Sequence, residues 1–326
     1  MTYKQFLPGA SIAVITGLAA LFLSEHYGAP AMLFALLLGI ALSFLYEETS
    51  CKAGIEFTAC HILRIGVALL GLRIALDDLF TLGWQTIALL AAAIFSTIAL
   101  GLLLAKLTGL RKSFGALTGG SVAICGASAA MAITAVLPEY KDKERDTLLT
   151  VIGVTSLSTI AMVVYPIAVT YFGLDSMDAG LFLGGTIHDV AQVVGAGFSI
   201  SEETGNTATL VKLVRVSMLM PVVLIMLLVI KRFHQGDTST GKAAKVPGFL
   251  VAFIVLMIIN SCFELPALVT ESATEVSRFA LIIAITAIGM KSNLAKLASV
   301  GMLPIFLMVM ETLWIAAFIL AAIFIL

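Results

Sequence analysis

The sequence predicts an all-α protein that crosses a membrane many times, and three observations lead to this fold class. Of its 326 residues 60% are hydrophobic and only 12% are charged, whereas about a quarter of the residues in a soluble domain are charged. The mean hydropathy is +1.09. Apolar stretches long enough to cross a bilayer as helices follow one another along the whole chain.

Nine apolar stretches are candidate membrane helices, some of which need flanking residues to cross fully. In order they are 10–23, 32–45, 62–76, 84–104, 148–172, 210–230, 249–263, 279–290 and 302–326. The segment MTYKQFLPGA leads into the first stretch without an evident cleavage site, so we expect that helix to be retained. With two further glycine-rich stretches, 115–137 and 180–200, we expect about 10–11 membrane elements in one transporter domain, residues 1–326.

The two glycine-rich stretches share a motif. Both GALTGGSVAICGASAAMA (115–132) and GLFLGGTIHDVAQVVGAG (180–197) begin with Gly-x-x-x-Gly-Gly, and Ser121 matches Thr186. Helices break inside a membrane only where protein buries the break or where it lines a cavity. The motif therefore predicts two interrupted helices, crossing or re-entrant, that form a duplicated binding element. The alternative is that the glycines only allow helices to pack closely.

A second internal similarity supports duplication. Gly71–Gly83 and Gly289–Gly301 have the same glycine spacing, a basic residue two positions after the first glycine, and matching leucines. The matched pairs are Arg73 with Lys291, Leu76 with Leu294, and Leu79 with Leu297. Inverted repeats with broken helices at the midplane are typical of secondary transporters.

The distribution of basic residues predicts the orientation. Most basic loops alternate onto one side, which should be cytoplasmic: Lys4, Lys52, Lys106, Arg111, Lys112, the 231–245 linker, Lys291 and Lys296. The exception is 141–145, which falls outside if 115–137 crosses completely. If 115–137 re-enters from the cytoplasm and 180–200 from outside, every clear basic loop is cytoplasmic.

The glycine-rich motifs also carry a family resemblance. GGSVAICGASAAMA, GGTIHDVAQVVGAG, TATLVKLVRVSMLMP (207–221) and RIGVALLGLRI (64–74) resemble the YeiH-like family of bacterial inner-membrane proteins, whose members are named as sulfate exporters. The resemblance covers most of the chain and implies an anion transporter of the bacterial inner membrane. The layout also looks like bile-acid symporters and sodium–proton antiporters, in which helices of a scaffold surround a moving core; here the core would contain 115–137 and 180–200.

Ionisable residues deep in a membrane segment are costly and therefore indicate function. His188 and Asp189 directly follow the second glycine motif. His188 could carry a coupling proton, with Asp189 as its partner or as a cation ligand. The alternative is that Asp189 caps the start of a helix.

Lys212 and Arg215 lie three residues apart, on one helical face of an apolar stretch. A buried positive pair suits an anionic substrate, and a guanidinium can bind two oxygens of a sulfonate or carboxylate. The alternative is that both side chains snorkel to the membrane surface.

The remaining candidates surround the glycine motifs. The hydroxyls of Ser121, Ser128 and Thr186, next to helix amides, suit an oxyanion, and Gln192 is four residues after His188 on the same face. The expected substrate-binding set is Gly119, Gly120, Ser121, Cys125, Gly126, Ser128, Gly184, Gly185, Thr186, Gln192, Lys212 and Arg215.

These observations favour a secondary transporter of a small anion, such as sulfate, sulfite, a sulfonate or a carboxylate, coupled to a proton or cation. An anion channel with a glycine-rich filter is the first alternative, and an intramembrane enzyme using His188 and Asp189 is the second. We expect no enzyme activity, because no serine or cysteine is arranged locally as a nucleophile with His188 and Asp189. No P-loop is present, so ATP drive would require another subunit. We also expect no cofactor, no nucleic-acid partner, since there is no long basic tract, and no metal, since the four cysteines lack zinc spacing. Expected partners are the anion and membrane lipid, and a homodimer is compatible with the sequence.

Overall fold

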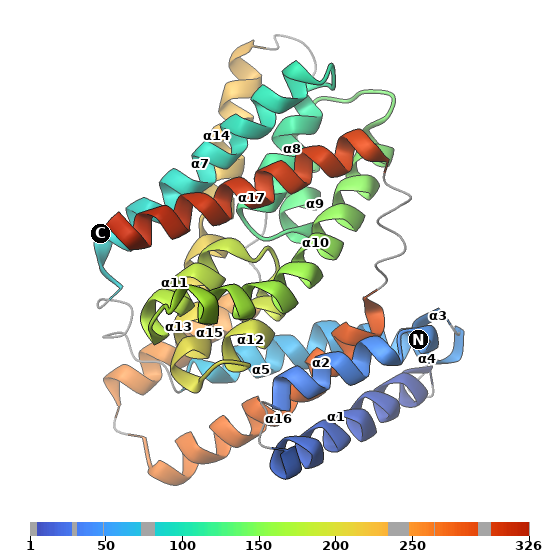
Figure 1. The fold of residues 1–326 in the computed structure, drawn as a ribbon, viewed down its shortest axis with the longest axis vertical. Helices are drawn as coiled ribbons and strands as arrows, with labels where there is room; N and C mark the ends of the chain where they lie inside the picture. The colour runs from blue at the N-terminus through green and yellow to red at the C-terminus, as the bar shows by residue number, and fades with distance from the viewer. Residues whose placement is uncertain are drawn as a thin grey trace. The chain divides into compact units, whose positions relative to one another are not determined.

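The computed structural model describes residues 5–27, 31–47, 49–72, 82–233, 248–263, 265–292 and 301–325. Within these ranges the secondary structure is helical, without a β-strand, and the predicted all-α class is confirmed (Figure 1). Seven of the described helices are long and apolar enough to cross a membrane: Leu7–Tyr27, Ser50–Leu70, Gly83–Leu107, Lys143–Phe172, Glu202–Ile230, Leu268–Lys291 and Met302–Ile325. Three shorter apolar helices accompany them: Ala31–Ala41, Ala127–Val136 and Gly248–Cys262.

The chain folds into two compact units, each built from separate parts of the sequence. Unit 1 contains Met1–Gly83, Ala191–Thr207 and Pro247–Asn293. Unit 2 contains Trp84–Val190, Ala208–Val246 and Leu294–Leu326. The single transporter domain over residues 1–326 stays a prediction.

Unit 1 is organised around α16. Its helices are α1 (Leu7–Tyr27), α2 (Ala31–Ala41), α3 (Phe44–Glu47), α4 (Thr49–Phe57), η2 (Thr58–Ile62), α5 (Leu63–Leu70), α15 (Gly248–Cys262) and α16 (Ala267–Lys291). Helix α16 packs against α1, α2 and α5. Gly39 of α2 and Gly289 of α16 lie so close that a Cβ atom on either would overlap the backbone of the other helix. Small residues at such contacts allow the close backbone packing that holds membrane helices together.

Unit 2 contains the first glycine-rich stretch and the start of the second. Its helices are α7 (Gly83–Leu107), α8 (Lys112–Ala123), α9 (Ala127–Val136), α10 (Lys143–Phe172), α11 (Ser176–Thr186), α14 (Leu219–Phe233) and α17 (Met302–Ile325). Two helices run across the boundary between the units, α12 (Val190–Phe198) and α13 (Glu202–Ser217). Helix α17 packs on α8, α10 and α11. It therefore contacts α10 as well as an element that precedes α10 in the sequence and one that follows it.

The first glycine-rich stretch is a helical hairpin. Helix α8 ends at Ala123, and α9 begins after Gly126, whose φ of +61° suits glycine. A Cβ atom on Gly120 of α8 would overlap the side chain of Ile133 of α9, thirteen residues later, so α9 folds back along α8. Beyond the hairpin, Arg111 Nη1 and Asp142 Oδ2 are 2.8 Å apart.

This ion pair joins the residue before α8 to a residue after α9. A continuous helix over Lys112–Val136 would separate its ends by about 37 Å, at about 1.5 Å per residue. The stretch therefore enters and returns at the same end, as the re-entrant interpretation predicts, and residues 141–145 lie on the same side as Arg111 and Lys112.

The second glycine-rich stretch is also interrupted. Helix α11 ends at Thr186, Ile187 has extended backbone with ψ of +139°, and α12 begins at Val190. In both glycine-rich stretches the helix thus ends shortly after the Gly-x-x-x-Gly-Gly motif, at Ala123 and at Thr186, which confirms the prediction of two interrupted helices. Re-entry of the second stretch stays a prediction.

The other repeat is described only at its ends. Arg73, Leu76, Leu79, Leu294 and Leu297 lie outside the described residues. Gly83 and Gly301, the last glycines of the two copies, have φ of +71° and +94°, and a long helix begins at or after each of them. The two copies therefore share a left-handed glycine at the same position.

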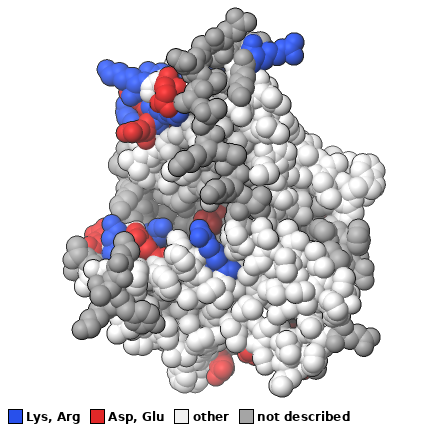
Figure 2. Space-filling view, turned by 180° about the vertical axis from the view of Figure 1, so that it is seen from behind, with Lys and Arg blue, Asp and Glu red and all other residues white. Residues whose placement is uncertain are grey.

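Figure 2 shows one face of the molecule, on which charged side chains are gathered in a few small groups and large areas carry neither acidic nor basic residues. Large apolar side chains are exposed along the long helices, for example Ile15 at 66%, Ile167 at 66% and Leu313 at 54%. Exposed apolar side chains on helices of spanning length fit contact with lipid. The protein is a multi-pass membrane protein.

Candidate functional site

The two helix breaks meet inside unit 2. A Cβ atom on Gly126 of the first break would lie 3.6 Å from Cβ of His188 in the second. Two side chains of α13, Lys212 and Arg215, bind both breaks. We call the two breaks (122–126 and 184–190) together with Lys212 and Arg215 the crossing.

Arg215 is fully buried and donates from all three nitrogens of its guanidinium to backbone carbonyls. Towards the first break, Nε and Nη2 donate to Ala123 O at 3.1 and 2.7 Å, and Nη2 also to Val122 O at 3.2 Å. Towards the second, Nη1 donates to Gly184 O at 3.0 Å and Ile187 O at 3.1 Å. A guanidinium has five N–H donors, and these bonds use all of them.

Lys212, also fully buried, makes the same kind of connection. Its Nζ donates to Ile124 O at 2.7 Å and to Ile187 O at 2.9 Å. Both cations therefore join the carbonyl ends of α8 and α11. A helix C-terminus carries about half a negative charge and leaves carbonyls without helical partners, so the pair compensates both ends at once.

These contacts limit what the pair can do for a ligand. Side chains with no exposed surface and with carbonyl partners do not snorkel. In the described conformation Arg215 has no N–H left for a bidentate anion contact. It can attract an anion through its charge, while its hydrogen bonds hold the two breaks together.

His188 connects the second break to α17. Its ring is fully buried, with Nδ1 3.1 Å from Thr186 O and Nε2 3.0 Å from Thr312 Oγ1. A carbonyl oxygen only accepts, so Nδ1 donates there. The Thr312 hydroxyl lies 2.7 Å from Met308 O as well, and it can donate either to that carbonyl or to Nε2.

Asp189 is half-buried and directly precedes α12. Its backbone N–H donates to Ser158 Oγ of α10 at 3.2 Å. This is the position that the helix-capping alternative predicts. The coupling role of His188 and Asp189 stays a prediction.

The predicted hydroxyl groups occupy different environments. Ser121 and Thr186 are both fully buried and donate to the carbonyl four residues back, Leu117 O at 2.5 Å and Phe182 O at 2.6 Å. The two residues that match in the motif therefore make the same hydrogen bond, each inside its own helix. Ser128, in the first turn of α9, is exposed, whereas Cys125 is buried at the break.

The predicted glycines serve close helix packing. A Cβ atom on Gly184 would overlap Ala208 O of α13, and one on Gly119 would meet the backbone of α7 at Thr97 and Ile98. Gly120 faces Ile133, and Gly185 faces Ile319 of α17. The packing alternative thus accounts for these four glycines, and Gly126 is the one whose backbone shapes the break.

One predicted residue lies in the other unit, and one residue that was not predicted lies in unit 2. Gln192, which was predicted, is buried in the unit 1 part of α12. Glu311 of α17, which was not, is fully buried and accepts a hydrogen bond from Thr118 Oγ1 of α8 at 2.8 Å. A lone acidic residue in the apolar stretch 302–326 is the sequence signal that could have identified it.

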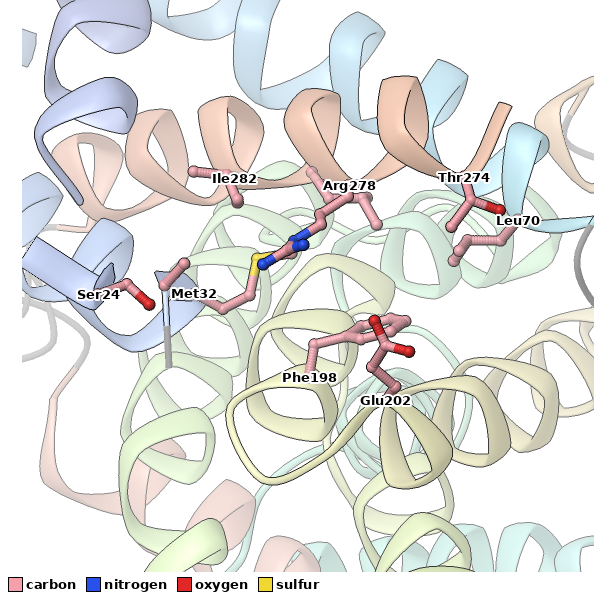
Figure 3. Close-up of a pocket in the computed structure, with 10 residues that line it drawn as sticks. Ser24, Met32, Leu70, Phe198, Glu202, Thr274, Arg278 and Ile282 are labelled. Atoms are coloured by element: carbon pink, nitrogen blue, oxygen red, sulfur yellow. The ribbon is translucent and has the colours of Figure 1, made fainter. Parts of the chain in front are cut away.

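Unit 1 contains a separate pocket of about 170 Å³. Figure 3 shows Arg278 of α16 extending towards Met32, with Phe198 and Glu202 facing it. Ser24 and Thr274 add hydroxyl groups to the lining. None of these residues was predicted as a site residue.

Helical structure, spanning lengths and two broken helices define the chain as a polytopic α-helical membrane protein. It belongs to the family described as "Conserved hypothetical protein 698", which matches residues 7–308, as the resemblance predicted.

Relatives of nearly full length are called UPF0324 membrane proteins. RB0971 of Rhizobium meliloti is 56% identical over 97% of this chain and 92% of its own, and TauZ of Paracoccus denitrificans is 54% identical over 96% and 93%. CT0845 of Chlorobaculum tepidum is 48% identical over 98% and 90%. No solved structure matches the chain.

Proposed function

We propose that the protein is a secondary transporter of a small anion, such as sulfate, sulfite, a sulfonate or a carboxylate, coupled to a proton or cation. The observation that carries this proposal is the crossing: two interrupted helices that meet around a buried lysine and a buried arginine.

The charges at the crossing favour an anion. A helix end carries about half a unit charge, which is negative at the carbonyl end and positive at the amide end. Two carbonyl ends (α8 and α11) and two amide ends (α9 and α12) lie at the breaks, so their partial charges nearly cancel. Within the crossing itself, Lys212 and Arg215 then outweigh the carboxylate of Asp189, which directly precedes α12. A site with excess positive charge in a membrane attracts an anion.

Within this proposal, Lys212 and Arg215 hold the carbonyl ends, and the anion binds towards the amide end of α9, beside Gly126 and the exposed Ser128. The positive charge of the crossing draws the anion to the amides in the first turn of α9. Broken helices that bind substrate with their amide ends are a recurrent arrangement in transporters.

The glycine packing disfavours a channel filter. A filter exposes backbone carbonyls to the passing ion. Here the carbonyls at the breaks accept from Lys212 and Arg215, and Gly119 and Gly184 are covered by neighbouring helices.

A thermal-shift screen of the purified protein in detergent tests the proposal. Sulfate, sulfite, methanesulfonate and dicarboxylates are compared at constant ionic strength, with choline and glucose as non-anionic controls. A ligand at about 100 times its dissociation constant stabilises the protein by about 2.7 kcal/mol, which raises the melting temperature by several degrees. Equal melting temperatures with every anion and control would contradict an anion site.

A further inference from the structure

Glu311 is a buried carboxyl group that the proposed anion site leaves without a role. It lies in the middle of α17, in one of the seven helices of spanning length, and has no exposed surface. One oxygen, Oε1, accepts from Thr118. The other, Oε2, is buried and has no hydrogen-bond partner among the described residues.

The space around this carboxyl is made by glycines. A Cβ atom on Gly101 of α7 would meet Glu311 Oε1, and one on Gly119 of α8 would lie 3.5 Å from it. Both glycines also serve the contact between α7 and α8, since Gly101 approaches Gly115 O. The carboxyl thus fits into a recess of backbone where three helices meet.

Burial makes the energy of the Glu311 carboxyl depend strongly on whether it is protonated. An ionised carboxylate needs donors or a counter-ion when it is buried, and Thr118 is one neutral donor. A protonated carboxyl carries no charge, so its burial costs far less. Binding and release of a proton therefore change the local energy strongly.

Among the described residues, the titratable and charged groups of the surrounding helices do not supply a counter-ion for Glu311. Lys106 of α7 and Lys112 of α8 are exposed near helix ends, Asp178 is in the first turn of α11, and His188 faces the adjacent Thr312. The titratable groups of α10 are Lys143, Glu144, Arg145, Asp146, Tyr165 and Tyr171, of which the first four lie in its first turn and Tyr165 packs on Phe182.

Glu311 is also connected to the crossing. The next residue, Thr312, binds His188 of the second break, and Thr118 belongs to the helix that ends at the first break. A charge change at Glu311 therefore acts on both broken helices.

We propose that Glu311 binds the proton that is transported together with the anion. The inference rests on the proposed anion transport. Proton binding removes a negative charge near the crossing and so favours the anion, and by linkage the anion favours the proton. His188 and Asp189 remain separate candidates for coupling.

The test compares two fluxes in proteoliposomes for the parent and Glu311→Gln, which imitates the protonated side chain and can still accept from Thr118. The first flux is exchange of labelled methanesulfonate against the same anion at equal pH on both sides. The second is net uptake driven by an acidic outside. When one proton moves with one monovalent anion, one pH unit raises the accumulation ratio about tenfold.

We expect Glu311→Gln to keep exchange but to lose the response of net uptake to the pH gradient. Glu275→Gln, which changes an exposed carboxyl of α16, should behave like the parent. Retention of the pH response by Glu311→Gln, or uptake driven by sodium instead of protons, would overturn the proposal. His188→Gln in the same assay shows whether that residue is needed as well.

A second measurement does not depend on transport. Infrared spectra of the reconstituted parent should contain the carbonyl band of a protonated, buried carboxyl group, and Glu311→Gln should lack this band. Thr118→Val should move the midpoint at which the band titrates, because it removes the hydrogen bond to Oε1. Spectra without a difference between the parent and Glu311→Gln would overturn proton binding at Glu311.

The two experiments separate the two proposals. If the parent shows the band but neither flux, the proposed transport fails and proton binding stands. If Glu311→Gln does not insert, Glu311→Met, which has a similar length and also lacks a carboxyl group, replaces it in both experiments.

Discussion

Single residues carry the strongest constraint at the crossing, and Arg215 is the clearest case. Its guanidinium joins the carbonyl ends of two helices that are separated by more than fifty residues in the sequence. Carbonyls that lose a buried donor cost about 1–3 kcal/mol each. The side chain is therefore a structural link between the two breaks, in addition to any attraction of a ligand.

We predict that Arg215→Met lowers the free energy of unfolding by about 3 kcal/mol or more, because the carbonyls of Val122, Ala123 and Gly184 lose the guanidinium as donor. The carbonyl of Ile187 keeps Lys212 as a donor. Thermal or denaturant unfolding of the purified protein measures this loss. The control is Arg111→Met, which breaks an ion pair whose side chains are 51% and 37% exposed and should cost at most about 1 kcal/mol. Equal stability of Arg215→Met and the parent would show that the guanidinium is not a structural link.

The sequence indicated that Lys212 and Arg215 are special, but not what they bind. An ionisable pair in an apolar stretch predicts burial with partners. The identity of the partners depends on how α13 approaches the two breaks, and the sequence of α13 does not contain that information. Glu311 was missed although it is the lone acidic residue of its apolar stretch; only its contact with Thr118, which joins residues 193 positions apart, could not be read from the sequence.

At the scale of elements, the motifs predicted the breaks, and only the loop charges indicated the direction in which the first stretch returns. Repeated Gly-x-x-x-Gly-Gly motifs predicted two interrupted helices, and both are present. The hairpin of α8 and α9 depends on the contact between Gly120 and Ile133, which no local pattern shows. Charge in the loops gave the correct preference because the basic residues 141–145 need to stay with Arg111 and Lys112.

Helix boundaries were predicted less well. The third apolar stretch was expected at 62–76, whereas the structure has a helix over Ser50–Leu70 that ends in a turn at Gly71. Polar residues such as Lys52 and Glu56 lower the hydropathy of its first half. Similarly, α16 begins at Ala267, twelve residues before the predicted stretch 279–290, because polar residues are tolerated on a helix that is partly exposed.

We predict the topology of the hairpin from single cysteines in a variant that lacks Cys51, Cys60, Cys125 and Cys262. Residue 141 should be protected from an impermeant reagent in right-side-out cells, because the hairpin returns it to the side of Arg111. Residue 175 should be labelled, because α10 has thirty residues and crosses the membrane. Residue 202 should also be labelled if the second stretch re-enters. Labelling at 141 but not at 175 would contradict the orientation.

Close packing of α11 against α13 gives another prediction. Gly184→Ala should destabilise the protein, because the added methyl group overlaps Ala208 O and moves Gly184 O away from Arg215. Overpacking of this kind costs about 1–3 kcal/mol. Gly248→Ala is the matched control, since a Cβ atom there meets nothing within 4 Å. The melting temperatures of both variants decide the question, and similar values for the two would argue against a tight contact.

At the scale of the whole molecule, composition and apolar stretches were sufficient for the class of protein, and the family comparison agrees. The division into two units was not predictable, because each unit combines three segments that are distant in sequence. The motifs that form the crossing, 115–132 and 180–190, fall in unit 2 together with Lys212, Arg215 and Glu311. The chemistry of the proposed transport is therefore concentrated in one unit.

The most direct test of secondary anion transport is counterflow with the purified protein in liposomes. Vesicles loaded with unlabelled anion are diluted into a trace of labelled anion, and uptake of label is followed over time. A carrier with a saturable site predicts transient accumulation of label above equilibrium and faster uptake than into empty vesicles. Uptake that rises linearly with anion concentration, with no acceleration by internal anion, would indicate a channel and contradict the carrier.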